Sequence, residues 1–294
     1  MISIAMATYN GERYLSYQMD SILNQSIQDF EVIVCDDNSS DSTWDILQKY
    51  HVNDSRIKIY RNPENLGFKR NFEKAMSLCK GDYVALCDQD DVWKPNHLEK
   101  LFSIIGNRML ACGNADLIDS EGRKIGLTLA QMESLDRLPS KGLDQAYTIV
   151  YFRSAFQGAS MLVKRAFLEI ALPIPQGANY HDSWFSLLSC FNGGIAYTFD
   201  SVNNYRMHNS NVTGHRVTRK SKTKDFIEQI FFSGKTYDRR FLLEGVKERI
   251  FNLSVDEVSF IDNSLKRINR AETIWGRILN FPFRLLNYKK IYSC

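Results

Sequence analysis

The stretch Cys87-Asp88-Gln89-Asp90-Asp91-Val92-Trp93 places three carboxylates within four residues. It follows the apolar run Tyr83-Val84-Ala85-Leu86, which is typical of a buried strand, and it precedes Lys94-Pro95, where the proline suits the first turn of a helix. We therefore expect the carboxylates where a strand ends and a loop begins. In open α/β sheets, ligands bind in the crevice outside the carboxyl ends of the strands.

Clustered carboxylates repel one another unless a positive charge lies among them. Oxygen ligands at this spacing suit a hard cation, Mg²⁺ or Mn²⁺, which shares its coordination shell with phosphate oxygens. The same residues could instead form a solvated acidic turn that caps the next helix. The acidic stretch alone leaves both interpretations open.

Apolar runs and helical patterns alternate along the first 90 residues. This alternation, with short loops, predicts an α/β fold with a doubly wound, mostly parallel sheet and helices on both faces. The polar loops after the first, second and fourth strands should then open on one edge and line one crevice. We expect strands at 2–8, 31–35, 56–61 and 83–86, and helices at 12–25, from 42 onward and at 68–80.

The pattern beyond the acidic stretch is less regular. Residues 110–118 and the turn after them indicate a hairpin, while residues 130–150 show no clear period. Further strands are expected at 156–163, 195–199 and 202–205, and helices at 96–105, 164–172 and 183–191. From Lys220 onward, bulky apolar residues among dense Lys and Arg predict two to four amphipathic helices. We divide the chain into a body, 1–215, and a basic helical C-terminal region, 216–294.

The net charge of +3 conceals an uneven distribution. Residues 216–294 carry 17 Lys and Arg against 9 Asp and Glu, and the rest of the chain is slightly acidic. Such a region is usually a solvated helical face. Its bulky aromatic residues favour contact with an anionic membrane surface, and no motif indicates a nucleic-acid partner.

The six cysteines form no C-x-x-C pair, so buried free thiols in a reducing compartment are expected and a zinc site is not. The N-terminus has no basic segment of a secretory signal, and no run of about 18 apolar residues predicts a membrane span. We expect a cytoplasmic location. Contact of the basic region with an anionic membrane would place the chain at the inner face of the cell membrane.

Neither glycine-rich phosphate-binding motif is present. No G-x-G-x-x-G follows the first strand, and no G-x-x-x-x-G-K-[ST] occurs. Phosphates in the crevice would therefore be held by a metal ion.

Five motifs occur in order at the expected strand ends, and together they resemble the family 2 glycosyltransferases, which have the GT-A fold. The resemblance covers roughly residues 1–215, and the sequence 88–93 looks most like the bacterial branch that builds surface polysaccharides, often described as rhamnosyltransferases. The motifs are Thr8-Tyr9-Asn10, Asp36-Asp37-Asn38-Ser39-Ser40-Asp41, Asn65-x-Gly67, Asp88-Gln89-Asp90-Asp91 and His181-Asp182.

The resemblance implies an inverting transfer of a sugar from a nucleotide-diphosphate donor. The donor-binding residues it implies are Thr8, Tyr9 and Asn10 beside the nucleotide, Asp36 or Asp37 on a uracil or thymine base, Asn65, Gly67 and Arg70 near the ribose or phosphates, and Asp88 facing the ribose and donor sugar.

The resemblance also implies a cation and a base. Asp90 would bind Mn²⁺ or Mg²⁺ with Asp91 nearby, and His208 would lie near the diphosphate or the metal. Asp182 would be the general base. The family motif usually has Glu before this Asp, whereas this chain has His181.

Each of these residues also has a structural interpretation. Asp36 and Asp37 could form only an Asx turn and a helix cap. Asp182 could cap the following helix, and His208 could be a surface histidine. Trp93 and Trp184 are more often core residues than sugar platforms.

The expected function is therefore transfer of a sugar from dTDP-rhamnose or a UDP-hexose to a hydroxyl of a glycan acceptor. We expect this acceptor to be lipid-linked and the reaction to belong to cell-surface polysaccharide synthesis. A sugar-nucleotide nucleotidyltransferase is an alternative, but it should show a glycine-rich, basic loop after the first strand. A non-catalytic sugar- or nucleotide-binding scaffold is another alternative, which the acidic triplet and Asp182 disfavour.

Overall fold

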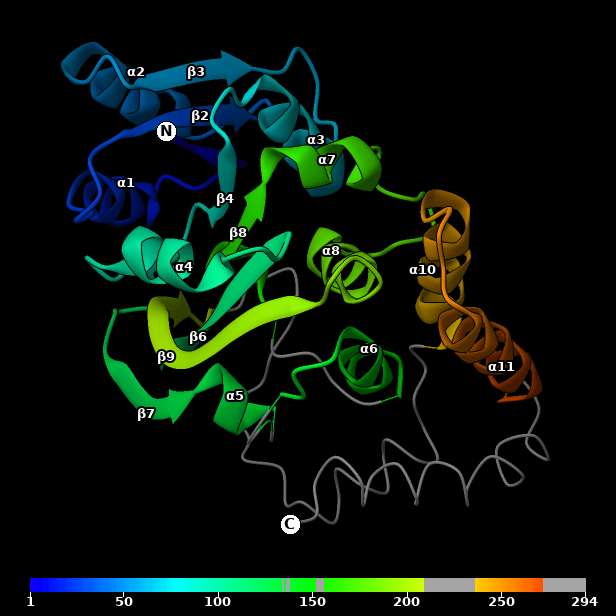
Figure 1. Cartoon of the computed structure of the whole chain (residues 1–294). Helices are drawn as coiled ribbons and strands as arrows, with labels where there is room; N and C mark the ends of the chain where they lie inside the picture. Colours follow the sequence, from blue (N-terminus) through cyan, green and yellow to red (C-terminus); the bar gives the residue numbers. More distant parts are fainter. Residues whose placement is uncertain (134, 136–137, 152–155, 209–235, 272–294) are drawn as a thin grey trace.

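The computed structural model describes residues 1–133, 135, 138–151, 156–208 and 236–271 of the chain. A single sheet of nine strands runs through these residues, with helices on both faces (Figure 1). The strands are β1 (Ile2–Thr8), β2 (Phe30–Asp36), β3 (Ile57–Arg61), β4 (Tyr83–Asp88), β5 (Val92–Trp93), β6 (Leu110–Ile118), β7 (Lys124–Thr128), β8 (Met161–Lys164) and β9 (Ile195–Arg206).

Ten α-helices and one 3₁₀ turn are assigned within the described ranges. The helices are α1 (Leu15–Leu23), α2 (Thr43–Asn53), α3 (Phe68–Leu78), α4 (His97–Ile105), α5 (Leu129–Met132), α6 (Gly142–Tyr151), α7 (Arg165–Ala171), α8 (His181–Cys190), α10 (Thr236–Arg249) and α11 (Val255–Ala271), and the 3₁₀ turn is η1 (Gly158–Ser160).

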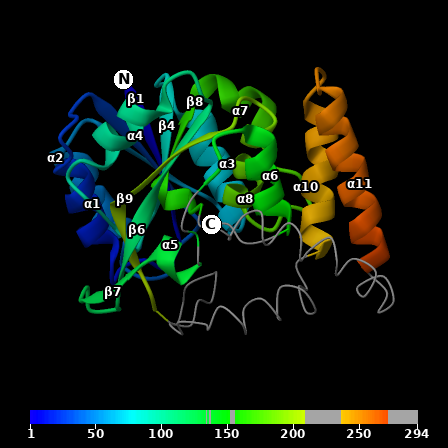
Figure 2. The ribbon, with the colours of Figure 1, turned by 60° about the horizontal axis from the view of Figure 1, so that its bottom comes forward.

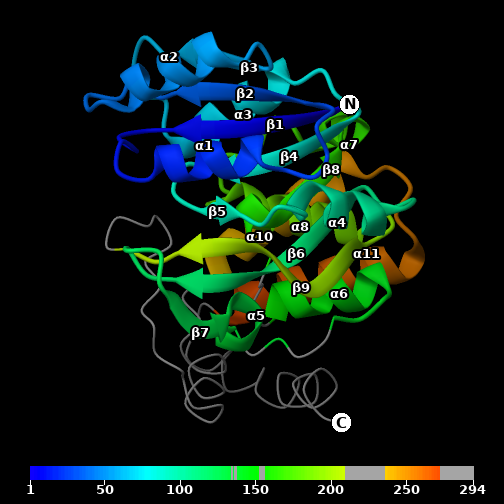
Figure 3. The same ribbon diagram turned by 90° about the vertical axis from the view of Figure 1, so that its left-hand side faces the viewer.

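The first half of the sheet is parallel, as predicted. β1 lies between β2 and β4, and β3 adds to the outer edge of β2, all in parallel. The register pairs Thr8 with Asp36 and Ala7 with Asp88. The three strands therefore end together, and β1, β6 and β9 all point to the same side of the molecule (Figure 3).

The second half of the sheet is mixed. β8 is antiparallel to both β4 and β6, whereas β9 is parallel to β6 and antiparallel to β5. The predicted hairpin is confirmed as β6 and β7. The strands predicted at 195–199 and 202–205 are one strand, because β9 keeps its pairing with β6 through two register shifts.

The strand predicted at 156–163 was wrong in its first half. Residues 158–160 form η1, closed by a bond from Ser160 N to the Gln157 carbonyl oxygen at 3.0 Å, and only Met161–Lys164 pairs in the sheet. A Cβ at Gly158 would collide with Nε2 of His181, so the imidazole of α8 requires glycine in this turn.

Each face of the sheet has its own hydrophobic core. Ile33 and Cys35 of β2 face a core shared with α3, α6 and α8, and Val32 and Val34 face a core shared with α1, α2 and α4. Figure 2 shows these helix groups on opposite sides of the sheet. Burial on both faces explains why the strands are continuous apolar runs rather than alternating ones.

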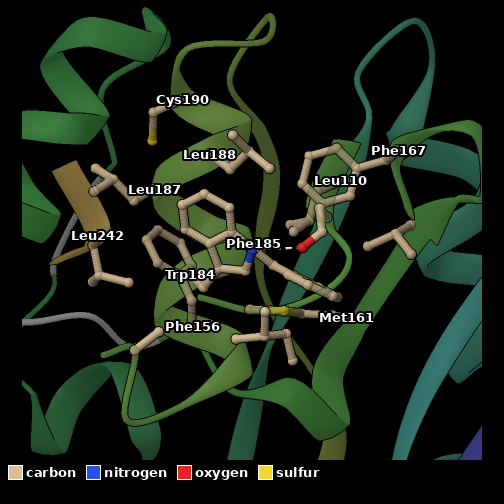
Figure 4. Close-up of a cluster of buried hydrophobic side chains, with 14 of the residues drawn as sticks. Leu110, Phe156, Met161, Phe167, Trp184, Phe185, Leu187, Leu188, Cys190 and Leu242 are labelled. Atoms are coloured by element: carbon tan, nitrogen blue, oxygen red, sulfur yellow. Dashed lines mark hydrogen bonds between the residues drawn. The ribbon is translucent and has the colours of Figure 1, made fainter. Parts of the chain in front are cut away.

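Helix α8 lies in the centre of the larger core (Figure 4). Trp184 is fully buried, and its indole nitrogen donates to the Ala171 carbonyl at 2.8 Å. Trp93 is buried too and donates to the Ala159 carbonyl at 3.1 Å. Both tryptophans are thus core residues, as expected. The helix that carries Asp182 is fixed by this packing.

The helices predicted for the C-terminal region are confirmed as α10 and α11, and residues 209–235 and 272–294 lie outside the described part. Leu242, Leu243 and Val246 of α10 belong to the same core cluster as Trp184. A Cβ at Gly245 would come within 3.0 Å of the Trp184 ring, so glycine allows α10 to pack closely on α8. These helices therefore share the core of the body.

Two other expectations concern the described residues. Cys35, Cys79, Cys87, Cys112 and Cys190 are buried free thiols, and Cys294 lies outside the described residues. No helix within the described ranges is both long and apolar enough to cross a membrane.

Leu243→Ala should destabilise the protein by about 2–5 kcal/mol, because a fully buried leucine leaves a cavity between α10 and α8. Val255→Ala is the control, since Val255 is 85% exposed; its effect should stay within about 0.5 kcal/mol. Urea unfolding measures both. Equal, small effects would contradict the shared core.

His97 should make the protein less stable at mildly acidic pH. Its ring stacks on Trp93 at 3.8 Å, its Nδ1 donates to the Val202 carbonyl at 3.0 Å, and burial lowers the pKa of His97 to about 3. The unfolded chain binds a proton below about pH 6.5 and the folded chain does not, so stability falls as pH falls through this window. The histidine should account for about 2 kcal/mol of loss between pH 7.5 and pH 5.

His97→Asn is the comparison, because its amide keeps a donor for the Val202 carbonyl and cannot titrate in this range. Urea unfolding of both proteins at pH 7.5 and pH 5 gives the difference. If the wild type and the variant lose the same stability between these pH values, His97 does not carry the predicted effect.

Candidate active site

The loops after β1 and β2 are held together by a set of hydrogen bonds. Asn10 has a φ of 47°, and its N–H donates to Ser39 Oγ at 2.9 Å. In return, Ser40 N donates to Asn10 Oδ1 at 2.9 Å, and Gly11 N donates to Thr43 Oγ1 at 2.7 Å. The predicted crevice wall is therefore one hydrogen-bonded unit.

Gln89 ties the acidic loop to the same unit. The side-chain oxygen of Gln89 accepts from Tyr9 N at 2.9 Å, and its amide nitrogen donates to the Tyr9 carbonyl at 3.0 Å. A Cβ at Gly11 would collide with this side chain. The three strand-end loops thus open on one edge, as predicted, with Tyr9 half exposed between them.

Asp36 is fully buried and its carboxylate is occupied by the protein. It accepts from Thr8 Oγ1 at 3.2 Å, from Ser39 N at 3.1 Å and from Ser39 Oγ at 2.5 Å, and Arg61 Nε lies 3.6 Å away. Three hydrogen bonds and the facing Arg61 guanidinium surround this carboxylate, whose side chain has no exposed surface. The Asx-turn interpretation therefore describes Asp36.

Asp37 organises the loop before α3. Its carboxylate accepts from Asn62 Nδ2 at 2.7 Å, Leu66 N at 2.8 Å and Gly67 N at 2.9 Å. Three donors leave one lone-pair site on Oδ2. Gly67 has a φ of 81°, which favours glycine at this point of the loop.

The other predicted donor-binding residues border the same loop. Asn65 Nδ2 donates to the Asp37 carbonyl at 3.3 Å, and Asn65 Oδ1 accepts from Gly67 N at 3.1 Å. Arg70 is exposed near the start of α3. Asn65 and Gly67 are thus brought against Asp37, beside the helix that presents Arg70.

Asp88 lies within electrostatic range of both Asp90 and Asp182, and we call these three residues the acidic cluster. Burial, followed by repulsion from Asp90 and from Asp182, raises the pKa of Asp88 to about 8. The carboxylate of Asp182 is therefore close to the acidic stretch, although the two are far apart in sequence. Asp182 lies in the first turn of α8, behind the N-cap Tyr180, and its Oδ1 accepts from Ser183 N at 2.5 Å.

His208 is brought directly to Asp90. Its Nε2 lies 2.9 Å from Asp90 Oδ2, and its ring centre is 4.9 Å from that of Tyr14. The surface-histidine interpretation does not describe this contact. His208 follows β9, so the last strand delivers an imidazole to the loop after β4.

Asp91 points into the protein rather than into the acidic cluster. It is fully buried and accepts from Asn203 Nδ2 at 2.7 Å, Arg206 N at 2.9 Å and Gln157 Nε2 at 3.2 Å. Burial, with repulsion from Asp90 and Asp88, raises the pKa of Asp91 well above its usual range. Its carboxylate anchors the acidic loop to β9 and to the segment before η1.

Arg206 is a site residue that sequence reasoning missed. Its Nε donates to the Asp90 carbonyl at 2.8 Å, so the guanidinium fixes the backbone of the predicted metal ligand. Asn203 and Gln157, which hold Asp91, were missed as well. Neither belongs to a motif: Asn203 reaches Asp91 because β9 pairs with β5 and β6, and Gln157 reaches it from the segment before η1.

His181 occupies the position before Asp182 as a neutral, buried side chain. Burial lowers the pKa of His181 to about 4, and its ring lies 4.5 Å from that of Phe72. Neither ring nitrogen has a hydrogen-bond partner among the described residues. It therefore packs α8 against α3 and η1 instead of adding charge to the acidic cluster.

The residues at the crevice suit a divalent cation shared with a phosphate-bearing ligand. No three His, Cys, Asp or Glu side chains converge as a preformed cation site in the part of the chain that the structure describes. Asp90 and His208 together offer one carboxylate and one imidazole. Such a set suits Mn²⁺, and Mg²⁺ also binds through one or two carboxylates and substrate phosphates.

Comparison of the sequence with known proteins gives a family. The model of glycosyl transferase family 2 matches residues 3–164. The chain is 26% identical over 292 residues to the putative glycosyltransferase EpsH of Bacillus subtilis, an alignment that covers 95% of this chain and 79% of EpsH.

A second relative is similar over a shorter segment. It is the UDP-Glc:alpha-D-GlcNAc-diphosphoundecaprenol beta-1,3-glucosyltransferase WfgD of Escherichia coli, 34% identical over 123 residues. That alignment covers 41% of this chain and 47% of WfgD.

Two solved structures have a similar fold. TarS of S. aureus, in complex with UDP-GlcNAc, gives a TM-score of 0.63 at 18% identity and covers 99% of this chain and 78% of that one. The mannosyltransferase PcManGT of Pyrobaculum calidifontis, in complex with GDP-Man and Mn²⁺, gives a TM-score of 0.54 at 15% identity and covers 98% and 74%. The fold of this chain is thus the GT-A fold expected from its motifs.

Proposed function

The chain belongs to glycosyl transferase family 2, and we propose that it transfers a sugar, with inversion and with a divalent cation, from a nucleotide-diphosphate donor to a hydroxyl of a glycan. The convergence of Asp182 with Asp88 and Asp90 carries this proposal. It supplies, at one sheet edge, carboxylates for both a cation and a proton transfer.

The donor nucleotide is assigned to the wall formed by the loops after β1, β2 and β3. Of the two adjacent aspartates, Asp37 is the better acceptor for the N–H of a uracil or thymine base, because one of its lone-pair sites is not used by the protein. Thr8, Tyr9 and Asn10 would border the nucleotide. Asn65, Gly67 and Arg70 would lie towards the ribose and phosphates, with Asp88 towards the ribose and donor sugar.

The diphosphate is assigned to Asp90 and His208. A divalent cation bound there would neutralise the charge that develops on the leaving nucleoside diphosphate. Asp90 contributes a charged oxygen ligand, and Arg206 holds the Asp90 carbonyl in place. The second metal ligand predicted at Asp91 is not carried forward, because that carboxylate is buried among three protein donors.

Asp182 is assigned as the general base. An acceptor hydroxyl is a weak nucleophile near neutral pH, and a carboxylate within hydrogen-bond reach that takes its proton typically contributes about 10²–10⁴-fold. The bond from Ser183 N fixes the orientation of Asp182 on a buried helix. One base gives a single displacement, and hence inversion of the anomeric carbon.

The acceptor is assigned to a lipid-linked glycan in surface polysaccharide synthesis. WfgD supports this assignment, because by its name it acts on a diphosphoundecaprenol-linked sugar. A UDP-hexose or dTDP-rhamnose donor and contact of the basic region 216–294 with an anionic membrane belong to the same proposal. The body, 1–215, would carry the reaction on the cytoplasmic side.

Replacing Asp90 should remove metal-dependent donor binding. Asp90→Asn keeps the shape of the side chain but loses the charge that holds the cation, so Mn²⁺ should no longer raise the affinity for UDP. Calorimetric titration of UDP with and without Mn²⁺ measures this. Asp82→Asn is the control, because Asp82 is exposed and directly precedes β4, at the end of this strand away from Asp90. An unchanged effect of Mn²⁺ in Asp90→Asn would remove Asp90 as the ligand.

Replacing Asp182 should separate binding from turnover. Asp182→Asn should bind the donor as the wild type does and lose about 10²–10⁴-fold in the rate of transfer. Asp45→Asn is a matched control, since Asp45 is an exposed acidic residue in the first turn of α2. Near-normal turnover in Asp182→Asn rules out the base assignment.

The released product distinguishes the competing functions. The protein is incubated with UDP-, dTDP- and GDP-sugars, Mn²⁺ and a crude lipid-linked acceptor fraction. A glycosyltransferase releases a nucleoside diphosphate, a nucleotidyltransferase releases pyrophosphate, and a scaffold releases neither.

A further inference from the structure

We propose that a cavity on the α1 side of the acidic cluster binds an anionic sugar unit of the acceptor. The cavity has a volume of about 480 Å³, within the range of roughly 300–1,000 Å³ that is usual for ligand sites. It is lined by the start of α1, the turn between β6 and β7, Val92 of β5 and the end of β9. Its role as an acceptor site rests on the glycosyltransferase function proposed above.

The floor of the cavity is aromatic. Tyr14 and Tyr17 are one helical turn apart, and the guanidinium of Arg206 lies 4.7 Å and 5.7 Å from their ring centres. Tyr17 is 62% exposed. A sugar ring has an apolar face of C–H groups, which packs on a rigid aromatic ring while the hydroxyls stay solvated. The exposed Tyr17 ring is the natural platform for such a face.

The walls of the cavity are cationic. Arg13, Lys124 and Arg206 line it, together with the single acidic residue Glu121. Arg13 pairs with Glu121 at 2.8 Å, but both side chains are more than half exposed, so this ion pair is weak and can exchange for a ligand. Arg206 contributes charge rather than donors, because its Nε and Nη1 already donate to the carbonyls of Asp90, Asp119 and Ser120; the N–H donors for a ligand come from Arg13 and Lys124. The excess of positive charge therefore selects an anionic ligand.

The Tyr14 hydroxyl is an independent sign of a ligand. Tyr14 is only 7% exposed, and its hydroxyl has no hydrogen-bond partner within the described ranges. A shielded hydroxyl without a partner is costly for the free protein. Tyr14 also lines the cavity, so a sugar or anion bound there would supply the missing partner after a small shift of the ring.

The position of the cavity favours the acceptor over the donor. Of the residues assigned to the donor nucleotide, Asp37 and Gly67 lie beside α3, on the other face of the sheet from α1, and only the loop 8–10 leads towards the cavity. Tyr14 connects the cavity with the acidic cluster, because its ring packs at a tilt of 37° against His208 and His208 Nε2 lies 2.9 Å from Asp90 Oδ2. A glycan held here thus lies one side chain away from the proposed metal ligand.

The anionic group could be a carboxylate of an acidic sugar or a phosphate, and two probes separate these sources. One is a tetrasaccharide of alternating N-acetylglucosamine and glucuronate, compared with its carboxyl-reduced, neutral form. The other is N-acetylglucosamine 1-phosphate. Binding to the full chain is measured by calorimetric titration in the absence of a donor.

Three variants locate the binding. Lys124→Gln removes a cation from the wall, Tyr17→Ala removes the platform, and Tyr14→Phe removes only the orphaned hydroxyl. Each should weaken the anionic probe about tenfold, the usual scale for losing one charge-assisted or buried contact. Arg123→Gln is the matched control, because Arg123 is the adjacent cation of the same turn, pairs with Asp119 at 2.8 Å and does not line the cavity.

The expected result is that the tetrasaccharide or the sugar phosphate binds, that the neutral form binds at least tenfold more weakly, and that only the cavity variants weaken binding. Binding of the tetrasaccharide that the cavity variants weaken identifies a carboxylate as the anionic group. The same result with N-acetylglucosamine 1-phosphate identifies a phosphate. Absence of binding by both probes, or equal affinities in the wild type, Lys124→Gln and Tyr17→Ala, overturns the proposal. Thermal unfolding should show Tyr14→Phe no less stable than the wild type, which excludes misfolding as the cause.

The two proposals fail differently. If the protein releases no nucleoside diphosphate but shows the variant pattern, the cavity stands as an anionic-glycan site and the transferase function fails. If turnover occurs and Lys124→Gln leaves the KM for an acidic acceptor unchanged, the cavity fails and the transferase function stands.

Discussion

Mutual repulsion of the carboxylates Asp88, Asp90 and Asp182 is the constraint around which the crevice is built. The end of β4 and the start of α8 bring the three to one sheet edge, and the raised pKa of Asp88 expresses the electrostatic cost of that arrangement. A positive charge would relieve this repulsion, and in the function we propose the divalent cation of a sugar nucleotide supplies it. The same unfavourable charge that costs the free protein stability thus becomes the basis of ligand selection in the function we propose.

The surrounding structure holds this cluster from three directions. Gln89 clips the acidic loop to the loop after β1, Asp91 anchors it to β9, and Arg206 binds the Asp90 carbonyl. The large core around Trp184 fixes α8, and with it Asp182. The core reaches into α10, so the C-terminal helices support the helix that carries the proposed base. Packing far from the crevice therefore sets the geometry within it.

Sequence alone predicts the first half of this fold well, because short loops and alternating apolar patterns restrict a chain to a parallel βα arrangement. The strands that end at Thr8, Asp36 and Asp88 were predicted within one or two residues. The second half was predicted less well, since β8 runs antiparallel and η1 replaces half of an expected strand. That turn depends on a tertiary contact, the His181 ring against Gly158, which has no local signal. The inward orientation of Asp91 and the role of Arg206 likewise depend on β9, so no local motif shows them.

In the function we propose, Asp90 and His208 hold a cation against the donor diphosphate, and Asp37 accepts a hydrogen bond from the base. A crystal structure of the full chain with UDP and Mn²⁺ tests it most directly. We expect Mn²⁺ to lie between Asp90 and the diphosphate and His208 to contact the metal or a phosphate oxygen. The uracil should lie beside Asp37. Nucleotide bound away from these strand ends, or Mn²⁺ bound without Asp90, would contradict the account.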